Sequence, residues 1–183
     1  MTLQQIKEAR ENRINYHENN VNDCGGRGRA FELRCAREKS HKTTVAEQNQ
    51  KDVSIKVFDG SKIRYIEAEC KTNGGRIEGF YNGSIKAKFV IYRLEYTQKL
   101  KFENDVRVIP PVIIPTDLFL NMLTEVKAIK AINRNGELDG YGIQVSSKKM
   151  YLRLNDYVNR YGDMVLFNNE KTFVLADFES ITL

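Results

Sequence analysis

The sequence predicts an α/β fold in which a central mixed β-sheet is flanked by helices. The clearest indication is a pair of alternating apolar and polar segments, 52–58 and 63–71, separated by the turn-forming sequence DGSK. A helix-forming segment precedes this pair, and an amphipathic helical pattern follows it. The length of 183 residues suits one domain. We therefore expect residues 1–183 to form a single domain, with a core over about 28–133 followed by a C-terminal part over 134–183.

The segment before the hairpin predicts two helices and a short strand. Thr2 and Gln5 have the spacing of a capping box, so a polar helix is expected to begin the chain. Asn, Asp and Gly residues over 19–28 indicate a loop. A second helix is expected over about 28–39, with Phe31 and Cys35 on one side, followed by a strand over 42–48.

The segment after the hairpin continues with strands and one long helix. A glycine-rich loop over 72–84 leads to a strand over 85–97, and the extended segment 106–115 carries Pro110 and Pro111, which favour a sheet edge. Thr116 is expected to cap a helix that runs to about residue 133. Helical spacing on its apolar side is shown by Phe119, Met122, Leu123, Val126 and Ile129.

The C-terminal part is predicted as four short strands, at 141–145, 148–154, 163–167 and 172–178. A helical turn is expected around 156–161. Internal repeats, low complexity and interdomain linkers are not found in the sequence.

The composition narrows the classes of function. Three cysteines without a CxxC pair and only two histidines argue against a zinc site or a histidine-based catalytic centre. No signal-peptide core and no apolar run of roughly 20 residues occur, so a cytoplasmic protein without a membrane partner is expected. The net charge of +5 is compatible with nucleic acid as a partner.

The predicted hairpin sorts its side chains onto two faces. A four-residue turn pairs Phe58 with Ile63, and a two-residue turn preserves the same parity. One face is then apolar, whereas the other carries three carboxylates and one ammonium. The apolar face is formed by Val53, Ile55, Val57, Ile66, Ala68 and Cys70, and the charged face by Asp52, Glu67, Glu69 and Lys71.

Clustered carboxylates beside a lysine are suited to metal-dependent chemistry. Carboxylates this close repel one another, and a hard divalent cation such as Mg²⁺ removes the repulsion. The neighbouring lysine can orient or deprotonate a water or stabilise developing negative charge. A solvated charged face of a β-meander is the alternative interpretation.

The spacing of Asp52, Glu69 and Lys71 resembles the signature of the PD-(D/E)xK nuclease superfamily. The first half is KDVSI, in which Lys51 stands where the signature has proline, and the second half is ECK, with sixteen residues between Asp52 and Glu69. The preceding segment GRGRAFELRCARE is similar to the helix that supplies a glutamate in that superfamily, here Glu32. The resemblance covers residues 28–71 and implies a restriction-endonuclease-like fold.

The resemblance implies a Mg²⁺-dependent endonuclease that hydrolyses DNA phosphodiester bonds, of a restriction, phage or mobile-element type, with Mn²⁺ as a substitute metal. Asp52, Glu69 and the Cys70 carbonyl would bind the ion, Lys71 would assist the attacking water, and Glu32 would hold a metal-bound water or second ion. Glu67 is either a solvated neighbour or an additional acid. A junction resolvase and a non-catalytic nucleic-acid-binding protein are the alternatives.

Basic residues elsewhere are candidates for contact with DNA. Two arginines precede the second helix, a glycine-rich basic loop follows Lys71, and a basic segment lies near residue 150. With a single site per chain, cutting both strands of a duplex would need a homodimer, which we expect, or two sequential nicks. The candidate contact residues are Arg27, Arg29, Asn73, Arg76, Lys86, Lys88, Lys148, Lys149 and Arg153.

Overall fold

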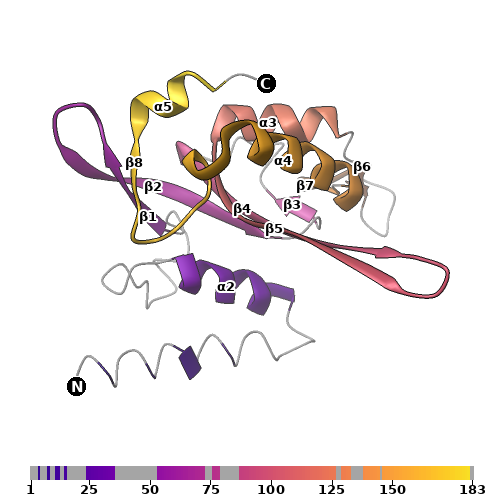
Figure 1. Cartoon of the computed structure of the whole chain (residues 1–183). Coiled ribbons are helices and arrows are strands. Elements are labelled where there is room, and N and C mark those ends of the chain that lie inside the picture. The colour runs from indigo at the N-terminus through magenta and orange to yellow at the C-terminus, as the bar shows by residue number, and fades with distance from the viewer. Residues whose placement is uncertain are drawn as a thin grey trace.

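The computed structural model shows a mixed β-sheet with helices on both sides (Figure 1). It describes residues 24–35, 53–72, 76–78, 87–126, 129–132, 138–144 and 146–181, together with Gln4, Glu8, Glu11, Asn12 and Asn15, which are helical. The side chains of 24–29, 76–78, 129–132 and 138–144 are outside this description. None of the described helices has the length and apolar character needed to cross a membrane.

The main sheet has five strands in the order β5-β4-β2-β1-β8. The β1–β2 and β4–β5 pairs are antiparallel hairpins, whereas β2–β4 and β1–β8 are parallel, so the predicted mixed α/β character is confirmed. The strands are β1 (Val53–Phe58), β2 (Ile63–Thr72), β4 (Phe89–Lys99), β5 (Asn104–Pro115) and β8 (Thr172–Val174).

The sheet is strongly curled. The chain bonds to the outer edge of β5 through Val165 and Phe167, and only five residues later it joins β1 at the opposite edge as β8. Five flat strand spacings would span roughly 24 Å, more than the about 17 Å that five extended residues can reach. The Phe167 ring stacks on Phe173 of β8, with ring centroids 6.0 Å apart, so the segment that bonds to β5 also packs against β8.

Helices cover the two faces of this curled sheet (Figure 1). Helix α2 (Cys24–Cys35) lies on one side, and α3 (Thr116–Glu125) and α4 (Ser147–Tyr161) lie on the other. Alternation directs Val90, Tyr92 and Leu94 of β4 to the α3–α4 side, where the Tyr92 ring meets Phe119 at 5.4 Å. The burial of these apolar side chains is the main stabilising contribution.

The remaining elements are small. Strands β3 (Arg76–Glu78), β7 (Leu138–Gln144) and β6 (Ile129–Ile132) form a separate antiparallel sheet. A 3₁₀ helix, η2 (Gly162–Met164), follows α4, and α5 (Leu175–Glu179) follows β8 directly. Phe178 of α5 packs edge-on against Phe89 and also contacts Phe173.

Several sequence predictions about the C-terminal half are wrong. Residues 148–154 are helical in α4 rather than extended, because Met150, Leu154 and Tyr157 are the buried residues and their spacing is helical. Residues 163–167 form η2 and an isolated bridge, and 172–178 divide into β8 and α5. The predicted strand at 141–145 is confirmed as part of β7.

Helix α3 is shorter than expected, and Thr116 does not cap it. The helix ends at Glu125, and Ile129 belongs to β6 because pairing with β7 overrides the continuing helical spacing. Thr116 instead donates its hydroxyl to the Ala87 carbonyl at 2.6 Å, tying α3 to the start of β4. The edge position predicted for Pro110 and Pro111 is confirmed, and the β4–β5 register shifts beside them.

Helix α2 begins four residues before the expected position. Phe31 and Cys35 are buried as expected, at 5% and 3% exposure. The strand predicted at 42–48 lies outside the described residues.

Candidate active site on the β1–β2 hairpin

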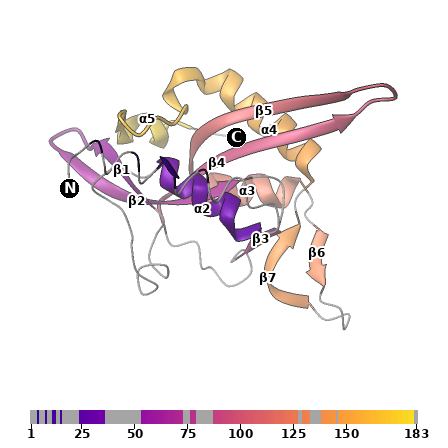
Figure 2. The same ribbon diagram turned by 90° about the horizontal axis from the view of Figure 1, so that it is seen from below.

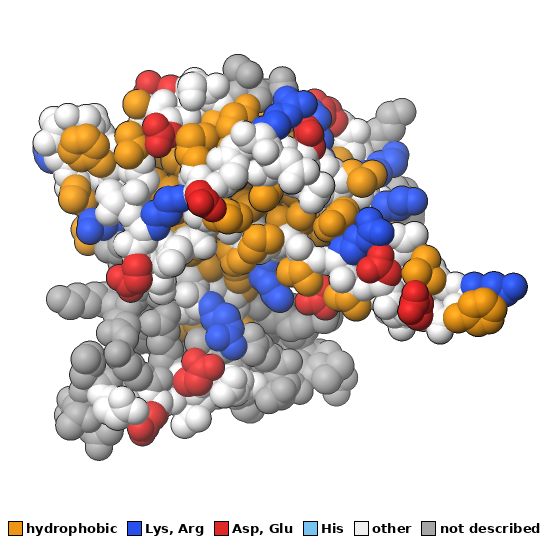
Figure 3. All heavy atoms as spheres, viewed as in Figure 1, with side chains coloured by type: hydrophobic (Ala, Val, Ile, Leu, Met, Phe, Trp, Pro, Cys, Tyr) orange, Lys and Arg blue, Asp and Glu red, His pale blue; other side chains and the backbone are white. Residues whose placement is uncertain are grey.

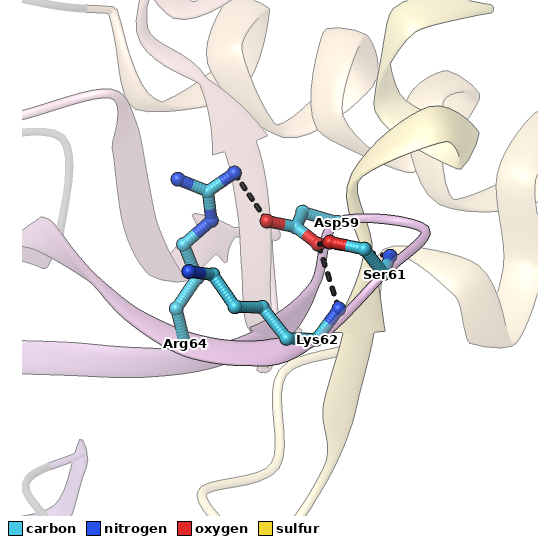
Figure 4. Close-up of polar contacts among 4 residues, drawn as sticks. All are labelled: Asp59, Ser61, Lys62 and Arg64. Atoms are coloured by element: carbon cyan, nitrogen blue, oxygen red, sulfur yellow. Dashed lines mark hydrogen bonds and ion pairs between the residues drawn. The ribbon is translucent and has the colours of Figure 1, made fainter.

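The turn between β1 and β2 is organised by the carboxylate of Asp59 (Figure 4). One carboxylate oxygen accepts hydrogen bonds from the backbone N–H groups of Ser61 and Lys62, at 3.0 and 2.9 Å, and from the Ser61 hydroxyl at 2.8 Å. The other oxygen forms an ion pair with Arg64. These hydrogen bonds and the Arg64 charge hold the pKa of Asp59 well below its usual range. Gly60 supplies the φ of 93° that the turn needs.

The hairpin register agrees with the four-residue turn predicted from the sequence. Phe58 pairs with Ile63, and the register continues without a bulge to the pair Val53 and Ala68. The predicted apolar face is confirmed, since most of its members are buried and Ile66 packs partly buried against the core. Asp52, the first acid of the signature, lies outside the described residues.

Glu69 and Lys71 form a close ion pair on the other face of β2. Lys71 Nζ donates to Glu69 Oε1 at 2.6 Å, and the side chains are 24% and 22% exposed. Partial removal from water strengthens the attraction between the two charges relative to a fully solvated pair. Glu67, two residues earlier on the same face, is exposed. The pair is therefore partly shielded from water yet still accessible to a ligand.

This face of β2 is continuous with the surface under α3. The parallel register places Glu69 beside Val90 and Lys71 beside Tyr92, both of which point towards the α3–α4 layer. Thr72, by contrast, lines a cavity together with Phe31 and Cys35 of α2. Helix α2 thus covers the opposite face of β2.

Glu32 is half-buried on α2. Helix α2 lies across β2 from the Glu69–Lys71 pair. Among the described residues, the pairing of β1 with β2 ends at Ala68, just before Glu69. The role assigned to Glu32 stays a prediction.

Within the part of the chain that the structure describes, no cluster of three or more His, Cys, Asp or Glu side chains could hold a metal ion. Glu69 is the described carboxylate of the predicted set, and its oxygen is a hard ligand of the kind that Mg²⁺ prefers. The Cys70 side chain is buried in the core at 6% exposure, so only its carbonyl could serve, as the resemblance implies. The third predicted donor, Asp52, is outside the described residues.

The predicted DNA contacts are scattered over several elements. Lys88 is exposed just before β4, and Lys148 and Lys149 are exposed in the first turn of α4. Arg153 is engaged by Glu125 of α3 at 2.6 Å, which points to a role in packing α4 against α3. Arg27 and Arg29 lie in α2 and Arg76 in β3, without described side chains, and Asn73 and Lys86 are outside the described residues.

Two features were not anticipated from the sequence. One is a cavity of about 630 Å³ on the α2 side of the sheet, where charged and amide groups mix with aromatic ones. Its lining combines five segments that are distant in the sequence, so no local pattern could have indicated it. The lining residues are Phe31, Arg34, Cys35, Thr72, Arg93, Glu95, Pro111, Phe167, Asn168 and Asn169.

The second unanticipated feature is the length of the β4–β5 hairpin, which projects well beyond the sheet (Figure 2). The sequence between the two predicted strands, QKLKFEND, carries exposed apolar residues among charges. The alternation of side chains along β4 continues to Lys99, two residues beyond the predicted end of the strand, and this could have indicated the longer hairpin.

Comparisons with known proteins assign no family. No family model matches the chain, and no curated protein or solved structure matches it. The functional argument therefore depends on the residues and geometry of the β1–β2 hairpin.

Proposed function

We propose that this protein is a metal-dependent nuclease of the PD-(D/E)xK type, with a restriction-endonuclease-like core, that hydrolyses DNA phosphodiester bonds. The observation that supports the proposal most is the Glu69–Lys71 pair, at 2.6 Å, on a hairpin with the register expected for that signature. The mixed sheet and the net charge of +5 are compatible with this function.

In this proposal Asp52, Glu69 and the Cys70 carbonyl would hold Mg²⁺, which supplies charge neutralisation at the phosphate and a more acidic water. Lys71 carries the positive charge closest to Glu69, so it can transfer its hydrogen bond from the carboxylate to a phosphate oxygen or to the attacking water. Glu32 would act from the edge of β2. The buried apolar residues on the reverse side of the hairpin fix the direction of Glu69 and Lys71.

The test is cleavage of supercoiled plasmid in Mg²⁺ or in EDTA by the wild-type protein and matched variants. Glu69→Gln, Lys71→Ala and Asp52→Ala are each expected to reduce the cleavage rate by about 100-fold or more. Glu67→Gln is the control, because it removes an exposed acid from the same face of the same strand. Loss of activity in Glu67→Gln equal to that in Glu69→Gln would contradict the assignment of the site.

A non-catalytic nucleic-acid-binding protein is the second candidate function. It is favoured by the Glu69–Lys71 ion pair, because a carboxylate that is already paired with an ammonium attracts a cation less strongly. Duplex, single-stranded and four-way-junction DNA and RNA should therefore be tested for both cleavage and binding. Binding without cleavage on every substrate would replace the nuclease proposal, whereas preferential cleavage of junctions would identify a resolvase.

A further inference from the structure

The β4–β5 hairpin projects from the rest of the sheet (Figure 2) and carries exposed apolar side chains (Figure 3). Leu100 N–H donates to the Glu103 carbonyl at 2.8 Å, which leaves Lys101 and Phe102 as a two-residue loop. Phe102 is 90% exposed, and Val106 and Val108 of β5 are 54% and 49% exposed. Burying this surface would be favourable, so a partner is expected to cover it.

Among the described residues, no strand pairs with the outer edge of β5 over 104–109. In the described part of the chain, the segment that bonds to this edge, Val165–Phe167, reaches only Pro111, Val112 and Ile113. Along an antiparallel ladder, residue pairs that are hydrogen-bonded to each other alternate with pairs that are not. Leu100 and Glu103 form a hydrogen-bonded pair, so Glu103, Asp105 and Arg107 direct their backbone groups towards β4. The backbone N–H and C=O groups of Asn104, Val106 and Val108 therefore point away from β4.

We propose that this edge of β5 pairs antiparallel with the same edge of a second copy of the chain, about a two-fold axis at Val106. Val106 then bonds to Val106 of the other copy, and Asn104 bonds to Val108. Asp105 lies opposite Arg107 of the other copy on both sides of the axis. The segment is thus complementary to itself in backbone groups, in apolar contacts and in charge.

Charge selects this register over its neighbours. An axis at Asp105 or at Arg107 would place like charges directly opposite, and an axis at Asn104 would place Asp105 opposite Glu103. An axis at Val108 would bring Asp105 to the level of Pro111, where the edge is already occupied by Phe167. Within one chain Arg107 and Asp105 are paired at 2.7 Å, so dimerisation joins two existing pairs into one network.

The ends of the paired segment also fit a second copy. The ladder stops at Pro110, which has no N–H to donate. At that level the hairpin loop of one copy, with the exposed Phe102, lies beside Pro110 of the other copy, so its apolar ring gains a cover. This inference concerns a surface remote from Glu69 and Lys71 and does not depend on the proposed function.

The first test is the molar mass in solution, measured by light scattering and sedimentation over a range of protein concentrations. The wild-type protein should be a dimer. Asp105→Arg and Arg107→Asp should each raise the dissociation constant about tenfold or more, and the double variant Asp105→Arg/Arg107→Asp should restore dimerisation. Asp156→Arg, which disrupts the exposed Asp156–Arg160 pair on α4, is the control and should leave the mass unchanged.

The outcomes of this test distinguish the partners that could cover the outer edge of β5. A wild-type monomer at every concentration would overturn the proposal. So would failure of the double variant to recover while circular dichroism shows that it is folded. Loss of DNA binding in the single variants, with no change in mass, would assign the hairpin to nucleic acid instead.

The second test examines the register by oxidative cross-linking. Val106→Cys should form a disulfide between position 106 of one chain and position 106 of the other, because these paired Cα atoms would be about 5.5 Å apart. Val108→Cys should not, because its two copies would be about 14 Å apart along the strands. The wild-type protein is the background control, and Cys35 and Cys70 are buried in it. Equal cross-linking of both variants would contradict the two-fold axis at Val106.

Discussion

The β1–β2 and β4–β5 hairpins share the same antiparallel ladder but are held in different ways. The β1–β2 turn is fixed by the Asp59 carboxylate, and its strands are flanked by β8 on one side and β4 on the other. The β4–β5 turn closes through the Leu100–Glu103 backbone bond, and β5 lies at the edge of the sheet. Alternation is present in both hairpins, so alternation alone does not tell whether a strand is enclosed or exposed.

This difference bears on function. In β2 the alternating polar residues Glu69 and Lys71 are shielded to below one quarter exposure, which couples their charges. In β5 the alternating apolar residues Val106 and Val108 are about half exposed, although their sequence pattern suits a core. A shielded charged pair suits chemistry, whereas an exposed apolar edge suits assembly.

The largest expected effect on stability separates the two hairpins directly. Ile55→Ala in β1 should lower the free energy of unfolding by about 2–5 kcal/mol, because Ile55 is 2% exposed and its removal leaves a cavity. Val106→Ala in β5 should change it by less than about 0.5 kcal/mol when the protein is dilute and monomeric. Urea unfolding followed by circular dichroism measures both. Equal losses would show that the projecting hairpin is enclosed in solution.

The β1–β2 register could be predicted because it depends on local signals. The strict alternation predicted the two faces for either turn length considered, and the structure selects the four-residue turn, with Phe58 paired with Ile63. Four of the five apolar positions predicted along one side of α3 are also buried, since helical spacing there reflects a single packed face. They are Phe119, Met122, Leu123 and Val126.

Other parts of the fold depend on contacts that no local pattern encodes. Residues 148–154 alternate like a strand, yet the alternating Leu152 is 57% exposed and the helical period of Met150, Leu154 and Tyr157 prevails. Ile129 pairs with Gln144 in β6–β7, fifteen residues away in sequence, so the end of α3 was placed too late. The curl of the sheet involves two segments distant from its central strands, since 165–167 bonds to β5 and β8 pairs with β1.

The candidate site could be predicted only in part. The sequence indicated that Glu69 and Lys71 share a face, and the structure adds that they are in contact at 2.6 Å. It also adds that α2 covers the other face of β2, which no spacing between Glu32 and Glu69 could reveal. The contribution of Asp52 stays a prediction that the cleavage experiment tests.

A smaller effect should show how the base of the β4–β5 hairpin is anchored. Tyr157 of α4 donates its hydroxyl to the Ile113 carbonyl at 3.0 Å, so Tyr157→Phe should cost about 1 kcal/mol of unfolding free energy. Burial and the neighbouring Tyr161 raise the pKa of Tyr157, so its contribution is present below its usual pKa and is lost as the pH rises above about 10. Between about pH 10 and higher pH, the unfolding free energy of Tyr157→Phe, measured by urea titration, should therefore decrease less steeply with pH than that of the wild-type protein. Identical alkaline slopes would contradict this account of Tyr157.

The smallest expected effect concerns the turn that distinguishes the two hairpins. The pKa of Asp59 is lowered by the Lys62 and Ser61 hydrogen bonds and by Arg64, so its stabilising contribution is present above the usual aspartate pKa and decreases as the pH falls below about 4. Asp59→Asn should remove part of this acid sensitivity and lower the melting temperature slightly at neutral pH. Asp105→Asn, in the exposed Asp105–Arg107 pair of the projecting hairpin, is the matched control in dilute protein. Melting temperatures of the three proteins between pH 7 and pH 2 provide the measurement. If Asp59→Asn keeps the full acid-induced loss, the carboxylate does not organise the turn, and the rigidity of the β1–β2 hairpin must come from its flanking strands alone.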